Sequence, residues 1–342
     1  MKEAILYRKL ENYKTECNIC QKRCVTGTNK KGFCKTRKNI DGKLYTLIYA
    51  KVASIAVSPI EKKPLFHFYP GSRWLSLGTL GCNFRCPGCQ NYDLSFAEPE
   101  ITGIKNKDQI DLILPEEAVE LAREYRCKGI SWTYNEPTIW FEYTYITAKL
   151  AKQNNLLTNY VTNGSITEEA LDLIGPYLDS FRVDLKGFTD EFYIRICHIS
   201  DFRPILEVTK RAKFKWEMHV EVVTNIIPGY SDDEEQLKGI ANWIKEELGK
   251  DTPWHVTQFV PHLELSHLSS TPVKTLEKAR EIGLEVGLEY VYIGNIPGHK
   301  GENTYCPKCK NLLIERDGFS IIRSNLAGNR CNRCNYKIWG EF

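Results

Sequence analysis

Three cysteines stand close together in the segment GCNFRCPGCQN, where Cys82, Cys86 and Cys89 have C-x3-C-x2-C spacing. Cysteine thiolates bind zinc and iron–sulfur clusters, but zinc ribbons and ordinary ferredoxin clusters use four of them. Three thiolates from one loop would bind three irons of a cubane cluster and leave the fourth iron open to an exchangeable ligand. We therefore expect a reactive cluster here; the alternatives are a chance grouping or a zinc loop with a distant fourth ligand.

Four cysteines near the C-terminus form two C-x2-C pairs, Cys306 with Cys309 and Cys331 with Cys334, separated by 21 residues. Two such pairs on a β-hairpin make a tetrahedral site of four sulfurs, as in a zinc ribbon. We expect structural zinc there, with rubredoxin-like iron as the alternative.

A second group of four cysteines lies near the N-terminus, where Cys17, Cys20, Cys24 and Cys34 have C-x2-C-x3-C-x9-C spacing. This spacing is less diagnostic than the C-terminal one. It fits an auxiliary [4Fe-4S] cluster that delivers electrons or binds substrate, and it fits structural zinc equally well.

The composition is that of a folded chain, because 42% of its 342 residues are hydrophobic and 26% are charged. The most apolar run, LIYAKVASIAV, is short and contains Lys51, so we expect neither a secretion signal nor a membrane span. Most of the 13 cysteines have metal-type spacing, which predicts a reducing, cytoplasmic location. The two cysteines outside the groups, Cys127 and Cys197, are expected to be buried structural residues.

Positive charge is concentrated at the N-terminus, where residues 1–40 carry eleven Lys or Arg against three Asp or Glu. Cations near metal-bound thiolates offset the negative charge of the site, which explains them without a partner. An anionic partner such as RNA is the alternative. Aromatic residues do not alternate with these charges as they do in stacking platforms, so nucleic acid is not expected as a partner.

Between about residue 74 and residue 296, six β-rich runs alternate with helical patterns. The runs begin at Trp74, Gly129, Leu156, Asp179, Met218 and Trp254. One helix is expected to open at Ser231 with a capping box, and another at Thr271 followed by a first-turn proline. Six strand–helix units predict parallel strands with right-handed crossovers, hence an α/β fold, a partial (βα)6 barrel of TIM type with helices outside.

The cysteine groups divide the chain into three expected units. Residues 1–72 form an N-terminal cysteine-rich module with an extension, residues 73–298 the partial barrel, and residues 299–342 a zinc-ribbon-like module.

Polar residues follow the strands of this barrel at their carboxyl ends, where barrel enzymes carry their chemistry. Asn135 and Glu136 follow the second strand, Asn163 the third, and Asp184 and Lys186 the fourth. Asp184 and Lys186 project to the same side, and charges inside a barrel are costly unless they are paired or bind something. The alternatives are a structural ion pair at the rim and, at Asn163, an ordinary turn.

The cysteine loop after the first strand resembles that of the radical S-adenosylmethionine (SAM) superfamily. The resemblance implies a [4Fe-4S] cluster whose open iron binds SAM and whose electron splits SAM to a 5′-deoxyadenosyl radical that takes hydrogen from a substrate. It also implies that Glu136, beside Asn135, receives the SAM amino group, although the family usually has Gly-Gly-Glu here. Asp184 and Lys186 would contact the amino-acid end and ribose of SAM, and Asn163 the ribose.

The whole chain looks like the radical SAM proteins of the AmmeMemoRadiSam system, relatives of pyruvate formate-lyase activating enzyme. The phrases that carry this resemblance are SPIEKKPLFHFYPGS, CPGCQNYDLS, TYNEPT, IIPGYSDDEEQ, WHVTQFVPHLEL and YVYIGNIPG. One departure is Gln258, where we expect arginine in relatives, so substrate handling in this chain could differ.

The leading functional hypothesis is therefore a radical SAM enzyme acting on an unidentified small molecule, peptide or lipid. It would need an electron donor of the flavodoxin or ferredoxin type and could have protein partners of the same system. One alternative is an activating enzyme that installs a glycyl radical on a partner protein. An alternative of another class is a zinc-ribbon RNA-binding protein whose barrel is only a scaffold.

Overall fold

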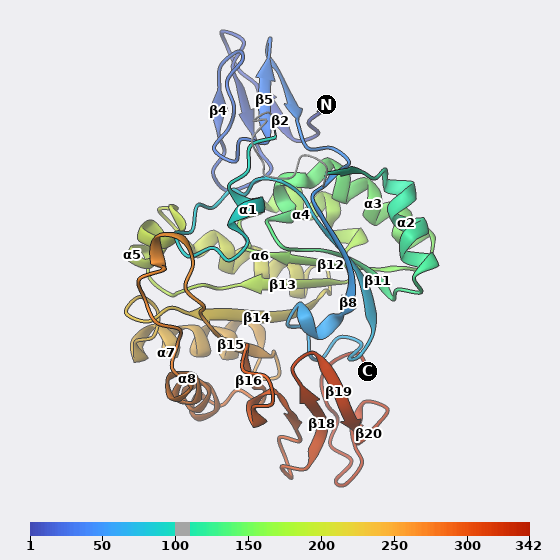
Figure 1. Cartoon of the computed structure of the whole chain (residues 1–342), viewed down its shortest axis with the longest axis vertical. Coiled ribbons are helices and arrows are strands. Elements are labelled where there is room, and N and C mark those ends of the chain that lie inside the picture. The colour runs from blue at the N-terminus through green and yellow to red at the C-terminus, as the bar shows by residue number, and fades with distance from the viewer. Residues whose placement is uncertain (100–109) are drawn as a thin grey trace.

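The computed structural model describes residues 1–99 and 110–342, and its centre is an eight-stranded sheet with the order β16-β15-β14-β13-β12-β11-β9-β8 (Figure 1). The strands from β9 to β16 run parallel, and β8 runs antiparallel to β9. Their bounds are β8 Ser54–Pro59, β9 Arg73–Gly78, β11 Gly129–Trp132, β12 Leu157–Thr162, β13 Ser180–Asp184, β14 His219–Ile226, β15 Trp254–Gln258 and β16 Val291–Gly294.

The parallel α/β organisation predicted from the sequence is confirmed, and all six predicted strands lie in this sheet as β9 and β11 to β15. The predicted number of strands was wrong, because β8 and β16 form the two edges. Neither β8 nor β16 is followed by an α-helix, and β8 pairs antiparallel with the strand that follows it, so counting strand–helix units does not reveal either strand.

Helices connect the strands of the sheet. They are α1 Tyr92–Ser95, α2 Pro115–Glu124, α3 Phe141–Gln153, α4 Glu168–Ile174, α5 Asp190–Phe192, α6 Arg203–Phe214, α7 Glu234–Trp243 and α8 Val273–Val286. The predicted capping box was misplaced by two residues: Asp233 caps α7 by accepting from the Gln236 amide, whereas Ser231 accepts from the Ile227 amide. Among the described residues, no helix combines the length and apolar character that crossing a membrane would require.

Strand β13 shows how the two faces of the sheet differ. Phe181 and Val183 are fully buried on one face, where a buried apolar side chain of this size contributes about 1.5–3 kcal/mol. Arg182 and Asp184 alternate with them and project to the other face. That face also carries hydrogen-bonded small polar side chains, on β13 itself and on the strands from β12 to β8: Ser180, Asn159, Ser131, Ser76 and Ser58. The charged residues predicted for the site therefore lie on a polar face.

Small sheets lie at the two ends of the long axis (Figure 1). At the N-terminal end they are built from β1 Lys2–Glu3, β2 Tyr7–Lys9, β3 Thr15–Cys17, β4 Val25–Thr26, β5 Arg37–Ile40 and β6 Lys43–Thr46, and beside the central sheet β7 Lys51–Val52 pairs with β10 Asp111–Leu112. At the C-terminal end they are built from β17 Thr304–Tyr305, β18 Leu312–Asp317, β19 Ser320–Ser324, β20 Leu326–Ala327 and β21 Arg330–Cys331.

The C-terminal sheets are attached to the central sheet through the segment around His67. The Glu341 amide donates to the His67 carbonyl at 2.8 Å, and the His67 ring lies 2.6 Å from the Trp339 carbonyl oxygen. Arg316 donates to the Phe66 carbonyl at 3.0 Å. These bonds hold the last residues of the chain against the sheet.

Glu221 on β14 in turn fixes this segment. Its buried carboxylate accepts from the amides of Phe66 at 3.0 Å and His67 at 2.8 Å, and it lies 2.9 Å from His219 and 2.6 Å from His255. Burial alone would raise the pKa of Glu221, but its contacts with the two histidines outweigh burial and lower it. This buried network joins segments more than 150 residues apart.

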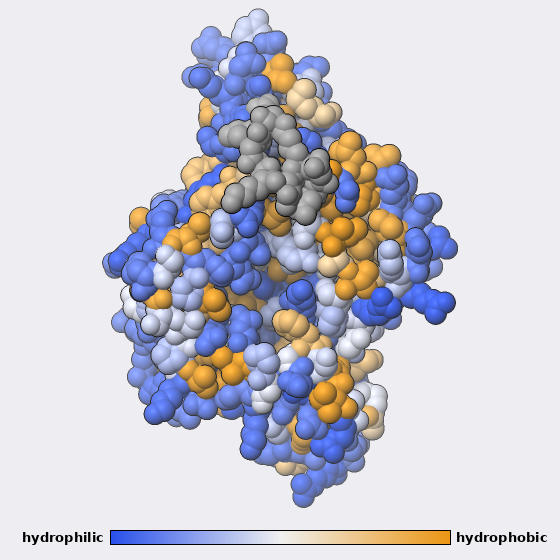
Figure 2. Space-filling model, viewed as in Figure 1, coloured by the Kyte–Doolittle hydropathy of each residue, from blue (hydrophilic) through white to orange (hydrophobic). Residues whose placement is uncertain are grey.

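The surface of the face shown in Figure 2 is hollowed near its middle, and apolar side chains gather on the side of the hollow nearest α2 and α3. Ligand sites are commonly concave and partly apolar. This face therefore has the shape and character of a ligand site.

Candidate radical SAM site

The cysteine loop begins where β9 ends, at Gly78, and its backbone is held by Asn135. The Asn135 side chain accepts from the Thr79 amide at 3.1 Å and donates to the Gly81 carbonyl at 2.7 Å. Gly81 has φ of +84°, a conformation that favours glycine. Asn135, predicted to bind SAM, is thus placed to fix the loop that carries the cysteines.

The three loop cysteines keep part of their residue surface exposed, although burial desolvates their thiols. The Cys82 sulfur accepts from the Phe84 amide at 3.4 Å, and the Cys89 sulfur lies 3.6 Å from the Ser95 hydroxyl. Hydrogen bonds of this kind orient thiolates and stabilise their charge. In the described part of the chain, only the C-terminal cysteines bring three or more potential ligand atoms all within 4.8 Å of one another. The more widely placed loop thiols fit separate irons of one cluster better than a single ion.

Cys197 lies beside the loop, a position that its place in the chain does not indicate. It is fully buried, as expected, and its thiol neighbours that of Cys86. The Cys197 thiol, together with the nearby Lys186 ammonium, lowers the pKa of Cys86 to about 7 despite burial. Burial raises the pKa of Cys82 and of Cys89. The proximity of Cys197 to Cys86 depends on packing between distant segments, so the spacing of the cysteines along the chain could not have predicted it.

Glu136 and Asn163 are brought together, as predicted. One Glu136 carboxylate oxygen, Oε1, accepts from the Thr138 amide at 3.0 Å and the Thr162 hydroxyl at 2.7 Å. The other oxygen, Oε2, accepts from the Asn163 amide at 2.7 Å. Burial raises the pKa of Glu136, and these hydrogen bonds oppose the rise. A carboxylate has about four acceptor positions, so Oε2 retains room for another donor.

Asn83, inside the cysteine loop, connects it to the end of β12 and was missed by the sequence analysis. Its oxygen accepts from the Asn163 side chain at 2.9 Å, and its nitrogen donates to the Ser165 hydroxyl at 2.6 Å. The Asn163 side-chain oxygen accepts from the Ser165 amide at 3.0 Å. The Asn163 side chain is thus already used within the protein, which favours the turn interpretation over direct ribose contact.

Asp184 lies between two cations on the polar face. The Lys186 ammonium is 3.1 Å from one carboxylate oxygen of Asp184, and Arg182 pairs with the other. Burial would raise the pKa of Asp184, but Arg182 and Lys186 outweigh burial and lower it. Asp184 and Lys186 form the ion pair that the sequence analysis considered. Arg182 is a second cationic partner of Asp184, which the sequence did not indicate.

Gln258 ends β15, where the sequence comparison led us to expect arginine. Its side chain donates to the Thr271 carbonyl at 2.9 Å, and its own carbonyl accepts from Asn225 at 3.0 Å. In this chain the residue therefore holds the loop before α8.

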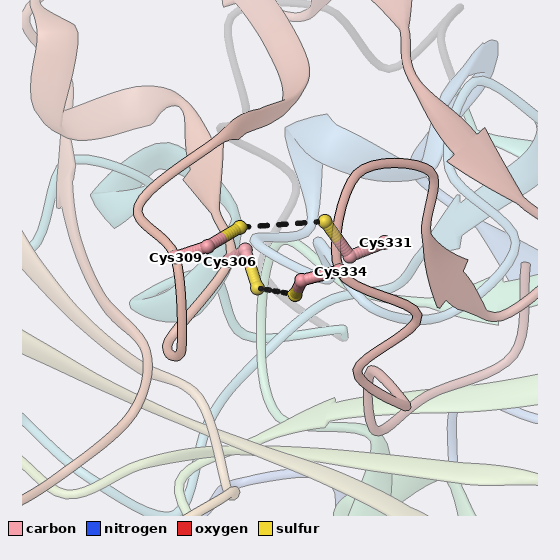
Figure 3. Close-up of side chains that lie close together, drawn as sticks. All are labelled: Cys306, Cys309, Cys331 and Cys334. Carbon is pink, nitrogen blue, oxygen red and sulfur yellow. Dashed lines mark hydrogen bonds between the residues drawn. The ribbon is translucent and has the colours of Figure 1, made fainter.

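The four C-terminal cysteines meet at one point (Figure 3). The sulfurs of Cys306 and Cys334 are 3.5 Å apart, and those of Cys309 and Cys331 are 3.7 Å apart. Tetrahedral bonds of 2.3 Å to one ion would place sulfurs about 3.8 Å apart. The donor set and spacing fit a single zinc or iron ion.

The N-terminal cysteines Cys17, Cys20, Cys24 and Cys34 are also brought together, around a shared cavity and not around a point. Cys17, Cys20 and Cys34 are buried.

Comparisons with known proteins relate the chain to one superfamily and to two archaeal proteins. A model of the radical SAM superfamily matches residues 77–244. The uncharacterized protein MJ0808 of Methanocaldococcus jannaschii is 44% identical over 340 residues, which cover 99% of each chain. MJ1632 of the same organism, whose name proposes glycyl-radical enzyme activation, is 25% identical over 227 residues, covering 65% of this chain and 79% of that one.

A solved radical SAM methyltransferase from Sphaerobacter thermophilus has a similar fold, with a TM-score of 0.50 and 15% identity over 69% of this chain and 71% of that one. The family match begins within β9 and includes the three loop cysteines, Glu136 and Asp184. A [4Fe-4S] cluster and SAM are the cofactors that such a domain implies, and the three loop thiols fit that cluster. This chain carries a radical SAM superfamily domain over residues 77–244 and is an enzyme of the radical SAM type.

Proposed function

We propose that this enzyme cleaves SAM reductively at a [4Fe-4S] cluster on Cys82, Cys86 and Cys89 and takes a hydrogen atom from its substrate. The observation that carries the proposal is the convergence of the three loop cysteines with Glu136 and the Asp184 ion pairs at the ends of β9, β11 and β13. The sheet would act as the partial barrel expected from the sequence, with two more strands than predicted.

When bound, the cluster and SAM together supply a 5′-deoxyadenosyl radical. The contribution of the chain is to hold the cofactor and the substrate in register, since such a radical takes whatever hydrogen is nearest. Glu136 would accept a hydrogen bond from the SAM amino group at Oε2, which has one protein donor against two at Oε1. Asn135 and Asn163 would act on SAM mainly by fixing the loops around it.

Asp184 and Lys186 are proposed to contact the amino-acid end and ribose of SAM. Both are partly exposed on the polar face, and Arg182 is buried behind them. Arg182 would keep Asp184 charged when Lys186 turns toward the cofactor. This arrangement lets the ion pair open without leaving a buried charge unpaired.

The substrate is proposed to be a small molecule, peptide or lipid, with electrons from a donor of the flavodoxin or ferredoxin type. A second candidate is glycyl-radical activation of a protein, which the partial similarity to MJ1632 favours. The sequence phrases support a place in the AmmeMemoRadiSam system, whose proteins would then be partners. Because the chain is an enzyme, the RNA-binding scaffold alternative is set aside.

For the C-terminal module we propose structural zinc on Cys306, Cys309, Cys331 and Cys334. Zinc suits a closed set of four thiolates in a small module that lacks a large core of its own, because metal binding then supplies the folding free energy. We also propose that the chain divides at about residues 72 and 298, because each end of the chain has a cysteine group and small sheets of its own outside the central sheet.

Electron paramagnetic resonance of the reduced, anaerobically reconstituted protein tests the proposed function. We expect a cluster signal that shifts when SAM is added, and loss of the SAM-responsive signal in Cys86→Ala. Retention of that signal in single alanine variants of all three loop cysteines would contradict the proposal.

A further inference from the structure

The N-terminal cysteines surround a space that the sequence alone could not assign. Cys17, Cys20, Cys24 and Cys34 line one cavity, with about 420 Å³ free of protein atoms including its opening to solvent. Apolar side chains complete much of the wall, among them Ile19, Phe33, Leu44 and Ile139. All four thiols thus face one largely apolar cavity.

The spacing of these thiols differs from that of the C-terminal group. In the residues described, 1–99 and 110–342, no three of the N-terminal thiols lie all within 4.8 Å of one another, whereas all four C-terminal thiols do. One zinc ion would need sulfurs about 3.8 Å apart. A cubane cluster binds each thiolate through a different iron, so it holds the sulfurs farther apart and fills the space between them.

The cavity also suits the negative charge of a thiolate-bound cluster. Lys22 and Arg37 line it, and the Phe33 amide donates to the Cys24 sulfur at 3.4 Å. The Thr36 hydroxyl lies 3.1 Å from the Cys34 sulfur. Cations and hydrogen bonds to sulfur are the usual stabilisers of such clusters.

The cavity adjoins the radical SAM loop directly. Asn83, which follows Cys82, forms part of its wall. A side chain at Gly81 would come within 2.4 Å of Thr36 and 3.0 Å of the Cys34 carbonyl, so glycine permits this close approach. The Gln21 amide also donates to the Ser165 carbonyl at 2.8 Å. The N-terminal module is therefore packed against the loop.

We propose that Cys17, Cys20, Cys24 and Cys34 bind a second [4Fe-4S] cluster. Four cysteine ligands leave no iron open, so this cluster binds neither SAM nor substrate, and one-electron transfer is the chemistry that remains to it. It accepts one electron from a donor of the flavodoxin or ferredoxin type and passes that electron to the loop cluster, returning to its oxidised state. This electron-transfer role rests on the proposed function, whereas the binding site itself does not.

The binding site is tested by metal analysis of two full-length proteins reconstituted anaerobically. The first carries Cys82→Ala, Cys86→Ala and Cys89→Ala, so its loop binds no cluster. The second carries Cys20→Ser and Cys34→Ser in addition. We expect the first to contain about four more irons per chain than the second, with equal zinc, and to show the Mössbauer spectrum of a [4Fe-4S] cluster.

The spectrum of the first protein keeps the test valid even if the second protein folds poorly. As a matched control, adding Cys127→Ser to the first protein should leave its iron content unchanged. If the two proteins differed in zinc content and not in iron content, the proposal would be overturned. The same holds if the first protein showed no spectrum of a cubane cluster. Both proteins lack the loop cysteines, so the result is independent of the proposed function.

The electron-transfer role is tested with Cys20→Ser and Cys34→Ser in the otherwise native chain. We expect flavodoxin-driven SAM cleavage to fall at least tenfold, while cleavage driven by dithionite, a small reductant that reaches the loop cluster directly, is retained. Equal loss with both reductants, or no loss with either, would overturn this role.

Discussion

The cysteine loop and the C-terminal module both bring thiols together in sets suited to metal binding, but the two sets differ in number, spacing and surroundings. In the C-terminal module, four sulfurs pair at 3.5 and 3.7 Å and fill a tetrahedron. In the loop, three partly exposed cysteines lie near Glu136 and Lys186, charged residues that follow other strands. A closed set of ligands stabilises a fold, whereas an open set beside fixed charges can bind and react with a cofactor.

The largest difference between the loop and the C-terminal module is expected when Cys86 is replaced. Cys86→Ala removes one of the three proposed iron ligands, so we expect SAM cleavage to fall below detection while the proposed C-terminal zinc is unchanged. Anaerobic turnover and zinc analysis of the same preparation measure both. Cys127→Ala, a buried cysteine outside the groups, is the control and should keep its activity. Turnover by Cys86→Ala at a rate near that of the native enzyme would show that the loop is not the reactive centre.

Loss of the C-terminal cysteines is expected to destabilise their module and to leave the loop cluster intact. Cys309→Ser with Cys334→Ser should release the metal and with it folding free energy on the order of 10 kcal/mol for the module. Hydrogen exchange in β18 and β19 should rise, while the SAM-responsive cluster signal remains. Zinc is expected to survive iron chelation in the native protein. A fragment from about residue 300 onward that contains rubredoxin-like iron would refute the zinc assignment.

A smaller effect is expected at Glu136, because its proposed contact is with SAM and not with the cluster. Glu136→Gln keeps the shape but removes the charge, and a charged hydrogen bond is worth about 1.5–3 kcal/mol, so SAM affinity should weaken about 10- to 100-fold. Titration of SAM into the reduced protein, followed by the cluster signal, measures this. Unchanged affinity with an intact cluster would remove Glu136 from the SAM site.

The smallest effect concerns how the C-terminal module is attached. Burial lowers the pKa of His67 to about 3, so below pH 6.5 the unfolded chain binds a proton that the folded chain does not. Stability is therefore present above pH 6.5 and lost as the pH falls. Between pH 7 and pH 6 the native protein should lose about 0.7 kcal/mol more than His67→Gln in chemical denaturation. Parallel losses in both proteins would show that His67 does not titrate in this way.

Features set by local spacing were predictable from the sequence, and features set by distant contacts were not. The cysteine groups, the six strands and the residues at their ends follow from short-range patterns. Cys197 beside Cys86, Arg182 behind Asp184, and edge strands β8 and β16 depend on how separate segments pack. The metal that the N-terminal cysteines would bind also depends on distant contacts, because spacing along the chain does not reveal the cavity that they line.

The central claim is that this chain generates a 5′-deoxyadenosyl radical, and product analysis tests it most directly. Protein with a verified cluster is incubated anaerobically with SAM and dithionite, and the products are identified by mass spectrometry. We predict 5′-deoxyadenosine and methionine, formed slowly without substrate and faster with it. S-adenosylhomocysteine in place of 5′-deoxyadenosine, or neither product from a preparation whose cluster is intact, would contradict the account.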